Sequence, residues 1–280
     1  MMRSRDGGQT WTRTSEATVQ SIVFDPLQPD TVYAGFGSTF YKTSDGGGSW
    51  TRSTGVSDGF CTSILILASR ILFASSSGVQ ASSDGGAAWT ASDSGMNGRN
   101  VFAFAVSPSI PAAVYSIAEF FPQSSYTQGL VHKSESSGAS WTKLPITVSP
   151  EPKTSQIVAD PLNAERIWIR ETDALWRSEN GGLNWLGLPA RDRVNDLGDV
   201  AASSRTSGYL VLSGTGTRYP GAIPYLACEK SFDGGASWSV FPVSLEKSSG
   251  TAVALDPQDG NSIFAGGELG GRGVLFRTRD

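Results

Sequence analysis

The sequence predicts an all-β fold: a β-propeller of four-stranded antiparallel blades, with six blades as the expected number. A turn motif that ends in tryptophan recurs six times, and successive motif tryptophans are 39 to 53 residues apart. Two more short strand patterns lie between successive copies, and no convincing stretch of 11 or more residues has a helical period. Four short strands in each repeat are typical of a propeller blade.

The recurring motif is an eight-residue box with the pattern Ser/Thr-x-Asp-x-Gly-x-x-Trp. Six of the eight tryptophans occupy its last position. Four copies are intact, one has asparagine in place of the aspartate, and one has Ser136 there. The box residues are Asp6, Trp11, Asp45, Trp50, Asp84, Trp89, Trp141, Asn180, Trp185, Asp233 and Trp238.

The chemistry of the box is that of a hairpin turn between the third and fourth strands of a blade. The aspartate accepts hydrogen bonds from backbone N–H groups just downstream, as in an Asx turn. Glycine supplies the positive φ angles of a tight turn, and the leading hydroxyl group bonds to the same turn. The tryptophan opens the next strand and packs back over the turn. We therefore expect the box aspartates to be structural and not catalytic.

Two further strands precede each box, and an Asp-Pro dipeptide separates them in several repeats. Residues 19–24 and 31–35 show this pattern in the first full repeat, with Asp25 and Pro26 between them. Proline cannot donate to a strand ladder and biases its neighbour toward turn geometry. The dipeptide therefore marks the end of the first strand of a blade.

The box, together with an upstream Asp-Pro turn and an aromatic-bearing strand, resembles the Asp-box, or BNR, repeat family of propellers. That family includes sialidases, xyloglucanases, sortilin-type receptors and the photosystem II assembly propellers. The resemblance covers the whole chain and is specific for the fold, whereas one fold hosts several functions. It implies a non-catalytic module that binds or scaffolds proteins or glycans, with a sialidase- or xyloglucanase-like glycoside hydrolase, complete or truncated, as the alternative.

The chain is expected to form one domain over residues 1–280 that begins and ends inside a repeat. The first box starts at Ser4 with almost no strand before it, and Asp280 is the aspartate expected of a further box. Residues 10–14 would then pair with residues 273–278 and close a six-bladed ring without open edges. The alternative is a piece of a seven- or eight-bladed propeller. In either case we expect a longer parent protein that is secreted or periplasmic, although this sequence has no signal peptide.

Composition excludes several classes of protein. Lys and Arg total 22 against 26 Asp and Glu, so the net charge of −4 argues against a nucleic-acid partner. No apolar run is long enough to span a membrane. The two cysteines, Cys61 and Cys228, are expected to be free buried thiols, and their number excludes a cysteine-based metal site. We expect no cofactor, no metal and a monomeric chain.

Strand order predicts that ligands contact the rim opposite the boxes. In a four-stranded meander the box turn shares its rim with the Asp-Pro turn, so the other rim carries the second-to-third loops and the connections between blades. Insertions lengthen that rim at residues 119–129 and 214–225, and a charged connection covers residues 191–196. Loops longer than a turn requires are often functional, although ordinary solvated loops are the alternative. The expected residues contacting a protein or glycan are Glu119, Tyr126, Asp192, Arg193, Asp196, Arg218 and Tyr219.

Catalysis is the second functional hypothesis, and the sequence selects no catalytic set. The resemblance to sialidases implies an arginine cluster, but the Arg-Ile-Pro strand that opens the sialidase domain is absent. A xyloglucanase-like site implies two facing carboxylates, and no spacing among the acidic residues selects a pair. The single histidine, His132, lies mid-strand, where a packed or solvent-facing residue is expected instead of a general base. The candidates are Arg99, Arg191, Arg193 and Arg218 for the cluster, and Asp58, Glu119, Asp192, Asp196 and Asp199 for the pair.

Overall fold

The chain is built from antiparallel β-sheets in the residues that the computed structural model describes. These residues are 1–6, 9–15, 19–53, 55–56, 59–97, 99–107, 109–110, 113–120, 128–148, 156–171, 173–188, 196–216, 225–241, 248–259, 262–269 and 272–279. They fall into two compact units, Met1–Phe104 with Val114–Lys143 and Ala105–Ala113 with Leu144–Asp280. No helix in this part of the chain is long and apolar enough to cross a membrane.

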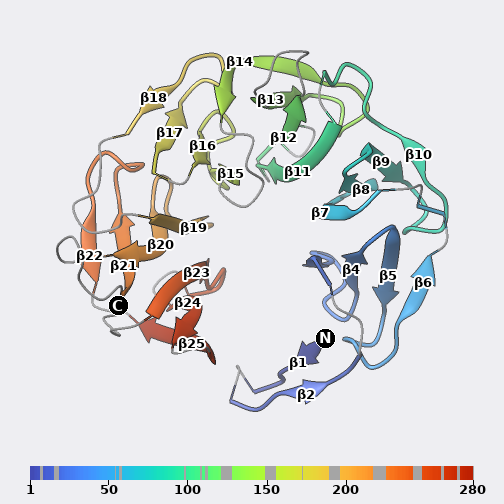
Figure 1. Ribbon diagram of the computed structural model, residues 1–280, viewed down its shortest axis with the longest axis horizontal. Coiled ribbons are helices and arrows are strands. Elements are labelled where there is room, and N and C mark those ends of the chain that lie inside the picture. Colours follow the sequence, from blue (N-terminus) through green and yellow to red (C-terminus); the bar gives the residue numbers. More distant parts are fainter. Residues whose placement is uncertain are drawn as a thin grey trace. The chain divides into compact units, whose positions relative to one another are not determined.

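The first unit contains a two-stranded sheet followed by two complete four-stranded sheets, drawn in blue to blue-green in Figure 1. The two-stranded sheet pairs β1 (Met2–Arg3) with β2 (Thr12–Arg13). The next sheet has the order β3 (Ser21–Phe24), β4 (Val32–Phe36), β5 (Thr39–Thr43) and β6 (Thr51–Ser53). After it come β7 (Cys61–Leu67), β8 (Arg70–Ser75), β9 (Gly78–Ser82) and β10 (Thr90–Ala91).

Three more complete sheets and a three-stranded one follow in sequence, each in simple up-and-down order. The first has β11 (Arg99–Val106), β12 (Val114–Phe120), β13 (Gln128–Ser134) and β14 (Thr142–Val148). The second has β15 (Gln156–Ala159), β16 (Ile167–Arg170), β17 (Leu175–Ser178) and β18 (Leu186–Gly187). The third has β19 (Asp196–Ala202), β20 (Leu210–Gly216), β21 (Tyr225–Ser231) and β22 (Ser239–Phe241). The last has β23 (Ser248–Leu255), β24 (Ser262–Leu269) and β25 (Arg272–Arg279).

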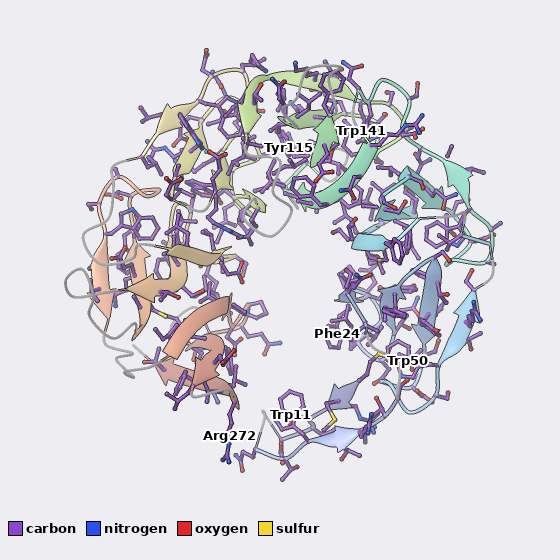
Figure 2. All side chains as sticks on the ribbon, viewed as in Figure 1. Trp11, Phe24, Trp50, Tyr115, Trp141 and Arg272 are labelled. Carbon is purple, nitrogen blue, oxygen red and sulfur yellow. The ribbon has the colours of Figure 1, made fainter. Side chains whose placement is uncertain are left out.

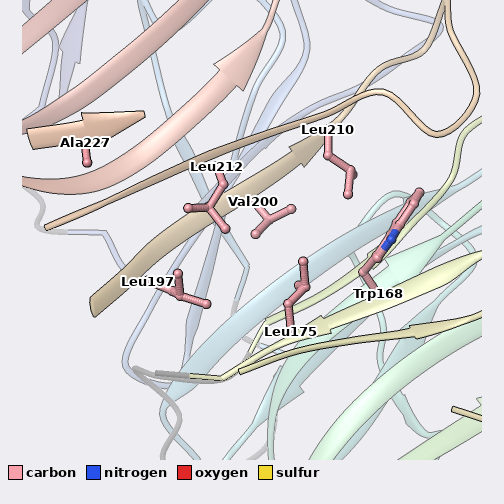
Figure 3. Close-up of a cluster of buried hydrophobic side chains, with 7 residues drawn as sticks. All are labelled: Trp168, Leu175, Leu197, Val200, Leu210, Leu212 and Ala227. Carbon is pink, nitrogen blue, oxygen red and sulfur yellow. The ribbon is translucent and has the colours of Figure 1, made fainter. Parts of the chain in front are cut away.

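Apolar side chains between neighbouring sheets hold each unit together. In the first unit, Tyr33 and Phe40 of one sheet pack against Ile64 and Phe73 of the next. In the second unit, Trp168 lies fully buried in a cluster between β15–β18 and β19–β22 (Figure 3). A strand between two such clusters is buried on both faces, as all four residues of β16 are. This is why the second strands read as continuous apolar runs, and truncating Trp168 to alanine should cost about 3–5 kcal/mol.

The predicted fold class is confirmed: the chain is an all-β propeller with six blade repeats. Five repeats are complete four-stranded sheets in the described residues. The described residues also form a three-stranded sheet, β23–β25, in the second unit and a two-stranded sheet, β1–β2, in the first. The proposed pairing of residues 10–14 with residues 273–278 stays a prediction, because these segments belong to different units.

The box turns share a rim with the turns between first and second strands, as strand order predicts. In the sheet β3–β6, the N–H of Gly46 in the box donates to the carbonyl of Asp30 at 2.7 Å. In the sheet β19–β22, the N–H of Gly234 donates to the carbonyl of Gly208 at 2.9 Å. The turns between second and third strands therefore lie at the opposite rim of each blade.

Candidate functional site

The box at Asp45 shows how the motif forms its turn. One carboxylate oxygen of Asp45 accepts hydrogen bonds from the Ser49 N–H at 2.9 Å and the Thr43 hydroxyl at 2.7 Å. The other oxygen accepts a hydrogen bond from the Ser49 hydroxyl at 2.7 Å. The Thr43 oxygen in turn accepts a hydrogen bond from the N–H of Gly47 at 3.0 Å. Gly46 and Gly47 have φ angles of 67° and 89°, in the left-handed region that favours glycine.

The boxes at Asp6 and Asp233 repeat this bonding, and it lowers the pKa of both aspartates. Hydrogen bonds from the hydroxyl and N–H of Thr10 lower the pKa of Asp6 to about 2. The hydroxyl and N–H of Ser237 do the same for Asp233, whose pKa is also lowered to about 2. Hydrogen bonds that favour the ionised form keep such carboxylates from acting as proton donors near neutral pH. The geometry therefore agrees with a structural role for the box aspartates.

The two boxes without an aspartate, at Ser136 and Asn180, keep part of the hydrogen bonding of the turn. Asn180 uses its amide oxygen to accept a hydrogen bond from the Asn184 N–H at 2.9 Å. Ser136 uses its hydroxyl oxygen to accept one from the Ser140 N–H at 3.0 Å. Ser137 of that box adopts a φ of 54° where the intact boxes have glycine. The turn thus survives loss of the aspartate with fewer and weaker hydrogen bonds.

The box tryptophans differ in burial. The indole N–H groups of Trp89, Trp185 and Trp238 donate to the carbonyl of the second box glycine, at 2.9 to 3.1 Å. Trp141 is 4% exposed and donates instead to the Ser92 carbonyl of the preceding sheet (Figure 2). Trp11, directly before β2, is 52% exposed. Three of the box tryptophans therefore bond to their own turn, and burial differs from box to box.

Of the ligand-contacting residues expected from the sequence, Glu119 is the one whose side chain the structure describes. It lies near the end of β12, at the opposite rim of the first unit, and is 9% exposed. The side-chain amide of Asn100 donates to a Glu119 carboxylate oxygen at 2.7 Å. Asn100 has a φ of 48°, and its N–H donates to the carbonyl of Ser76 in the β8–β9 turn at 3.1 Å. The carboxylate is thus fixed against a neighbouring blade.

Two exposed phenylalanines lie on the same rim. Phe36, at the end of β4, is 44% exposed, and Phe60, just before β7, is 70% exposed. The Phe60 N–H donates to the Ser76 hydroxyl at 3.0 Å, and the Ser76 N–H donates to the Phe60 carbonyl at 3.2 Å. A chain of hydrogen bonds therefore runs from Phe60 through Ser76 and Asn100 to Glu119. We call Phe36, Phe60, Ser76, Asn100 and Glu119 the unit 1 rim.

Sequence reasoning missed Phe36 and Phe60, because exposure of a single phenylalanine leaves no periodic pattern. The available signal was position: Gly37 follows Phe36 and Gly59 precedes Phe60, and glycine marks turns. Five other expected contacts, Tyr126, Asp192, Arg193, Arg218 and Tyr219, lie outside the described residues, as do Asp58 and Arg191. Asp196 begins β19, and its side chain is likewise outside the described part.

Asp199, a carboxylate considered for catalysis, is occupied by structural hydrogen bonds. Its two oxygens accept from the N–H groups of Val200 and Val253, each at 2.9 Å, which ties β19 to β23. Burial raises the pKa of the Asp199 carboxyl, while these bonds and the nearby Arg170 oppose the rise. Asp199 and Glu119 belong to different units.

The remaining titratable candidates are packed in the core. His132 is fully buried in β13, and burial lowers its pKa to about 4, so it is neutral at pH 7. This confirms the expectation of a packed strand histidine. Cys61 and Cys228 are free and buried, as expected, and burial raises the pKa of each thiol to about 12. The described residues contain no cluster of three or more side chains suited to hold a metal ion.

Comparison with known proteins bears on the fold. No family model matches the sequence, and no curated protein sequence matches it. An ancestral GH74 enzyme matches the structure with a TM-score of 0.70 and 18% identity, over 94% of this chain and 38% of that one. The GH74 xyloglucanase from Xanthomonas campestris matches with 0.67 and 18%, over 94% and 44%. A structure of YCF48 bound to D1 peptide matches with 0.67 and 21%, over 100% and 85%.

The chain is similar in fold to these propellers. It spans less than half the length of either GH74 enzyme. At such identities the likeness concerns the arrangement of strands, and function has to be argued from side chains.

Proposed function

We propose that the chain is a non-catalytic propeller of the Asp-box repeat family that binds a protein partner through the unit 1 rim. The box turns support the family assignment, because aspartate, hydroxyl and glycine act together in each intact copy as the motif requires. The similarity in fold to a YCF48 structure bound to a D1 peptide supports protein binding.

The observation that carries this proposal is the exposure of Phe60 and Phe36 on a rim held by backbone hydrogen bonds. The Cys61 N–H donates to the Gly37 carbonyl at 2.6 Å, so the turns that present the two rings are joined directly. Burying a phenylalanine side chain contributes about 1.5–3 kcal/mol, which an apolar partner would gain here. Pre-positioned aromatic side chains are typical anchors of protein interfaces.

Charged groups beside the rings would orient the partner. Arg99 is exposed at the start of β11, next to Asn100, and Glu119 is fixed by Asn100. A partner segment with apolar side chains flanked by a carboxylate would meet both the rings and the arginine. We propose that Tyr126, in the insertion after β12, extends this rim. For the second unit we propose separate ligand contacts by Asp192, Arg193, Asp196, Arg218 and Tyr219.

The proposal is tested by selecting peptides from a phage-displayed random library on the immobilised chain. Phe36→Ser and Phe60→Ser together should abolish capture of the selected peptides while leaving the melting temperature nearly unchanged. Phe24→Ser is the matched control, because Phe24 is also exposed, at 67%, but lies at the end of β3 outside the unit 1 rim (Figure 2). Equal capture by the double variant would show that the rim is not the binding surface.

The alternative function is glycoside hydrolysis, which the similarity in fold to a xyloglucanase favours. Incubation with soluble xyloglucan and measurement of released reducing ends distinguishes the two functions. A binding module releases none. Release that Glu119→Gln abolishes would favour the hydrolase and overturn the non-catalytic proposal.

A further inference from the structure

A cavity of about 630 Å³ lies on the box rim of the first unit, where no function has been assigned above. One wall comes from β5, β6 and the box turn between them, and the other from the box turn between β9 and β10. The volume falls within the range of sites for small molecules. Its charged lining residues are two cations, Lys42 and Arg52, and two anions, Asp45 and Asp84.

Asp84 differs from the other intact box aspartates in having a carboxylate oxygen available. In those boxes a hydroxyl four residues downstream donates to the second oxygen, as Ser49 does to Asp45 and Ser237 to Asp233. The corresponding residue after Asp84 is Ala88, which has no hydroxyl group. Three hydrogen bonds converge on Oδ1 of Asp84, and Oδ2 has no hydrogen-bond partner among the described residues. Asp84 lines the cavity, and its second carboxylate oxygen has no donor among the described residues.

Lys42 supplies the matching donor. Its ammonium nitrogen lies 3.2 Å from the position that a Cβ on Gly85 would occupy, so it reaches the box of the next sheet. Arg3 stands at the same place as Lys42, directly before the first hydroxyl of its box. Its guanidinium donates to the carbonyl of Gly46, the first glycine of the next box, at 2.7 Å. Lys42 makes no such hydrogen bond and no ion pair within the described part of the chain. Its nearest described partner is the Tyr33 ring, at 5.6 Å from the ring centroid.

The hydroxyl groups of Ser44 and Thr51 also line the cavity and make no hydrogen bond within the described residues. Both oxygens of Asp45 already accept hydrogen bonds, and Arg52 donates to the Thr39 hydroxyl. The remaining groups are one cationic donor, Lys42, one anionic acceptor, Asp84, and two hydroxyls that both donate and accept. An ionic ligand of either sign would lie beside a side chain of like charge. A ligand with many hydroxyl groups would satisfy all four, because each hydroxyl both donates and accepts.

We propose that this cavity binds a neutral polyhydroxylated molecule, of the size of a mono- or disaccharide. The Lys42 ammonium donates to one ligand hydroxyl, and Oδ2 of Asp84 accepts from another. The site is independent of the unit 1 rim, which lies at the other end of the blades.

Two substitutions test the site by completing the box bonding instead of breaking it. Ala88→Ser adds the hydroxyl that occupies Oδ2 in the other boxes. Lys42→Arg introduces the side chain that, at Arg3 and Arg177, donates to the carbonyl of the first glycine in the next box. Both variants should fold with an unchanged or higher melting temperature. Each should weaken sugar binding about tenfold, the change expected when one charge-assisted hydrogen bond is lost.

Binding is measured by titrating the ¹⁵N-labelled chain with cellobiose and following the backbone amide signals. We expect saturable shifts confined to the amides of the lining residues, above all Ser44, Thr51 and Gly85. Ser237→Ala is the matched control: it removes the equivalent hydroxyl from a box that does not line the cavity, and it should leave the affinity unchanged. Absence of saturable shifts, shifts confined to other residues, or an affinity that Ala88→Ser and Lys42→Arg leave unchanged would each overturn the proposal.

Discussion

At the scale of single residues, boxes with the same sequence motif differ in whether the second carboxylate oxygen of the aspartate accepts a hydrogen bond. The aspartate and leading hydroxyl form the same bonds in each intact copy. The residue four positions after the aspartate is variable, and it decides whether the second carboxylate oxygen is occupied, as with Ser49, or open, as with Ala88. The motif thus identifies a turn, and its variable position determines what that turn can bind.

Restoring aspartate at Ser136 should restore the hydrogen bonding of an intact box. Ser136→Asp restores an acceptor for the Ser140 N–H, which at present donates to a hydroxyl oxygen at 3.0 Å. A carboxylate is the stronger acceptor, so we expect a melting temperature that is unchanged or a few degrees higher. The opposite change, Asp45→Ala, removes the acceptor from an intact box and should lower it. Calorimetric melts of both variants check the pair; a clear loss of stability in Ser136→Asp would contradict the turn mechanism.

His132 should make the fold sensitive to mild acid. Burial lowers its pKa from 6.5 to about 4, and the nearby Lys143 adds to the shift. Between these values the unfolded chain binds a proton that the folded chain does not, so stability falls as the pH falls through this window. The expected loss is roughly 1.5 kcal/mol between pH 6.5 and pH 5.

Urea unfolding at several pH values measures this loss. In His132→Leu the slope across that window should disappear, whatever its stability at pH 7. The pKa values of the box aspartates Asp6 and Asp233 lie below the ordinary value of 3.8. Their titration therefore does not contribute to the change in stability between pH 6.5 and pH 5. A slope that persists in the variant would assign the acid sensitivity to another group.

At the scale of elements, an arginine directly before the box hydroxyl links its sheet to the box turn of the next one in two places. Arg3 bonds to the box carbonyl of Gly46, and Arg177 bonds to that of Gly234 at 2.9 Å. Ala81 stands at this position in the sheet β7–β10, and the box that follows it is the one that has lost both its aspartate and its first glycine. The six basic residues at this position are Arg3, Lys42, Lys133, Arg177, Lys230 and Arg277.

Arg177 offers the test of this link. Its guanidinium donates to the carbonyls of Asp233 and Gly234 and forms an ion pair with Glu179 at 3.0 Å. Arg177→Met should cost about 1–3 kcal/mol by leaving two box carbonyls without a charged donor. Arg177→Lys keeps the positive charge. Because Lys42, at the same position of another box, makes no hydrogen bond to the next box in the described part of the chain, this variant should cost nearly as much stability. A lysine variant as stable as the wild type would show that charge, and not the paired hydrogen bonds, makes the link.

At the scale of the whole molecule, the sequence predicted the fold far better than the site. The boxes at Asp45, Asp84 and Asp233 determine turns locally, and turns at regular intervals fix the strands between them. The unit 1 rim could not be predicted in this way. Phe60 and Asn100 meet through Ser76, and that meeting depends on how neighbouring blades align. Most of the expected contacts fall in long insertions, whose conformation no short-range pattern specifies.

The two thiols should report on the two units separately. Cys61 belongs to the apolar cluster between β3–β6 and β7–β10, and Cys228 to the cluster between β19–β22 and β23–β25. Both are at most 1% exposed, and burial raises both pKa values to about 12. We expect neither to react with iodoacetamide until its own unit unfolds. Mass spectrometry of the labelled peptides across a urea series measures this, and labelling of either thiol in native buffer would contradict it.

The way in which Phe60 is held has a practical consequence for protein engineering. Its position is fixed by its own N–H and carbonyl, both bonded to Ser76, and the neighbouring Cys61 N–H is bonded to Gly37. Such bonds are available to any residue with a backbone N–H, so positions 36 and 60 accept new side chains without redesign of the turns. Randomising these two positions should yield libraries of folded chains with altered recognition, in which the propeller serves as an interchangeable frame.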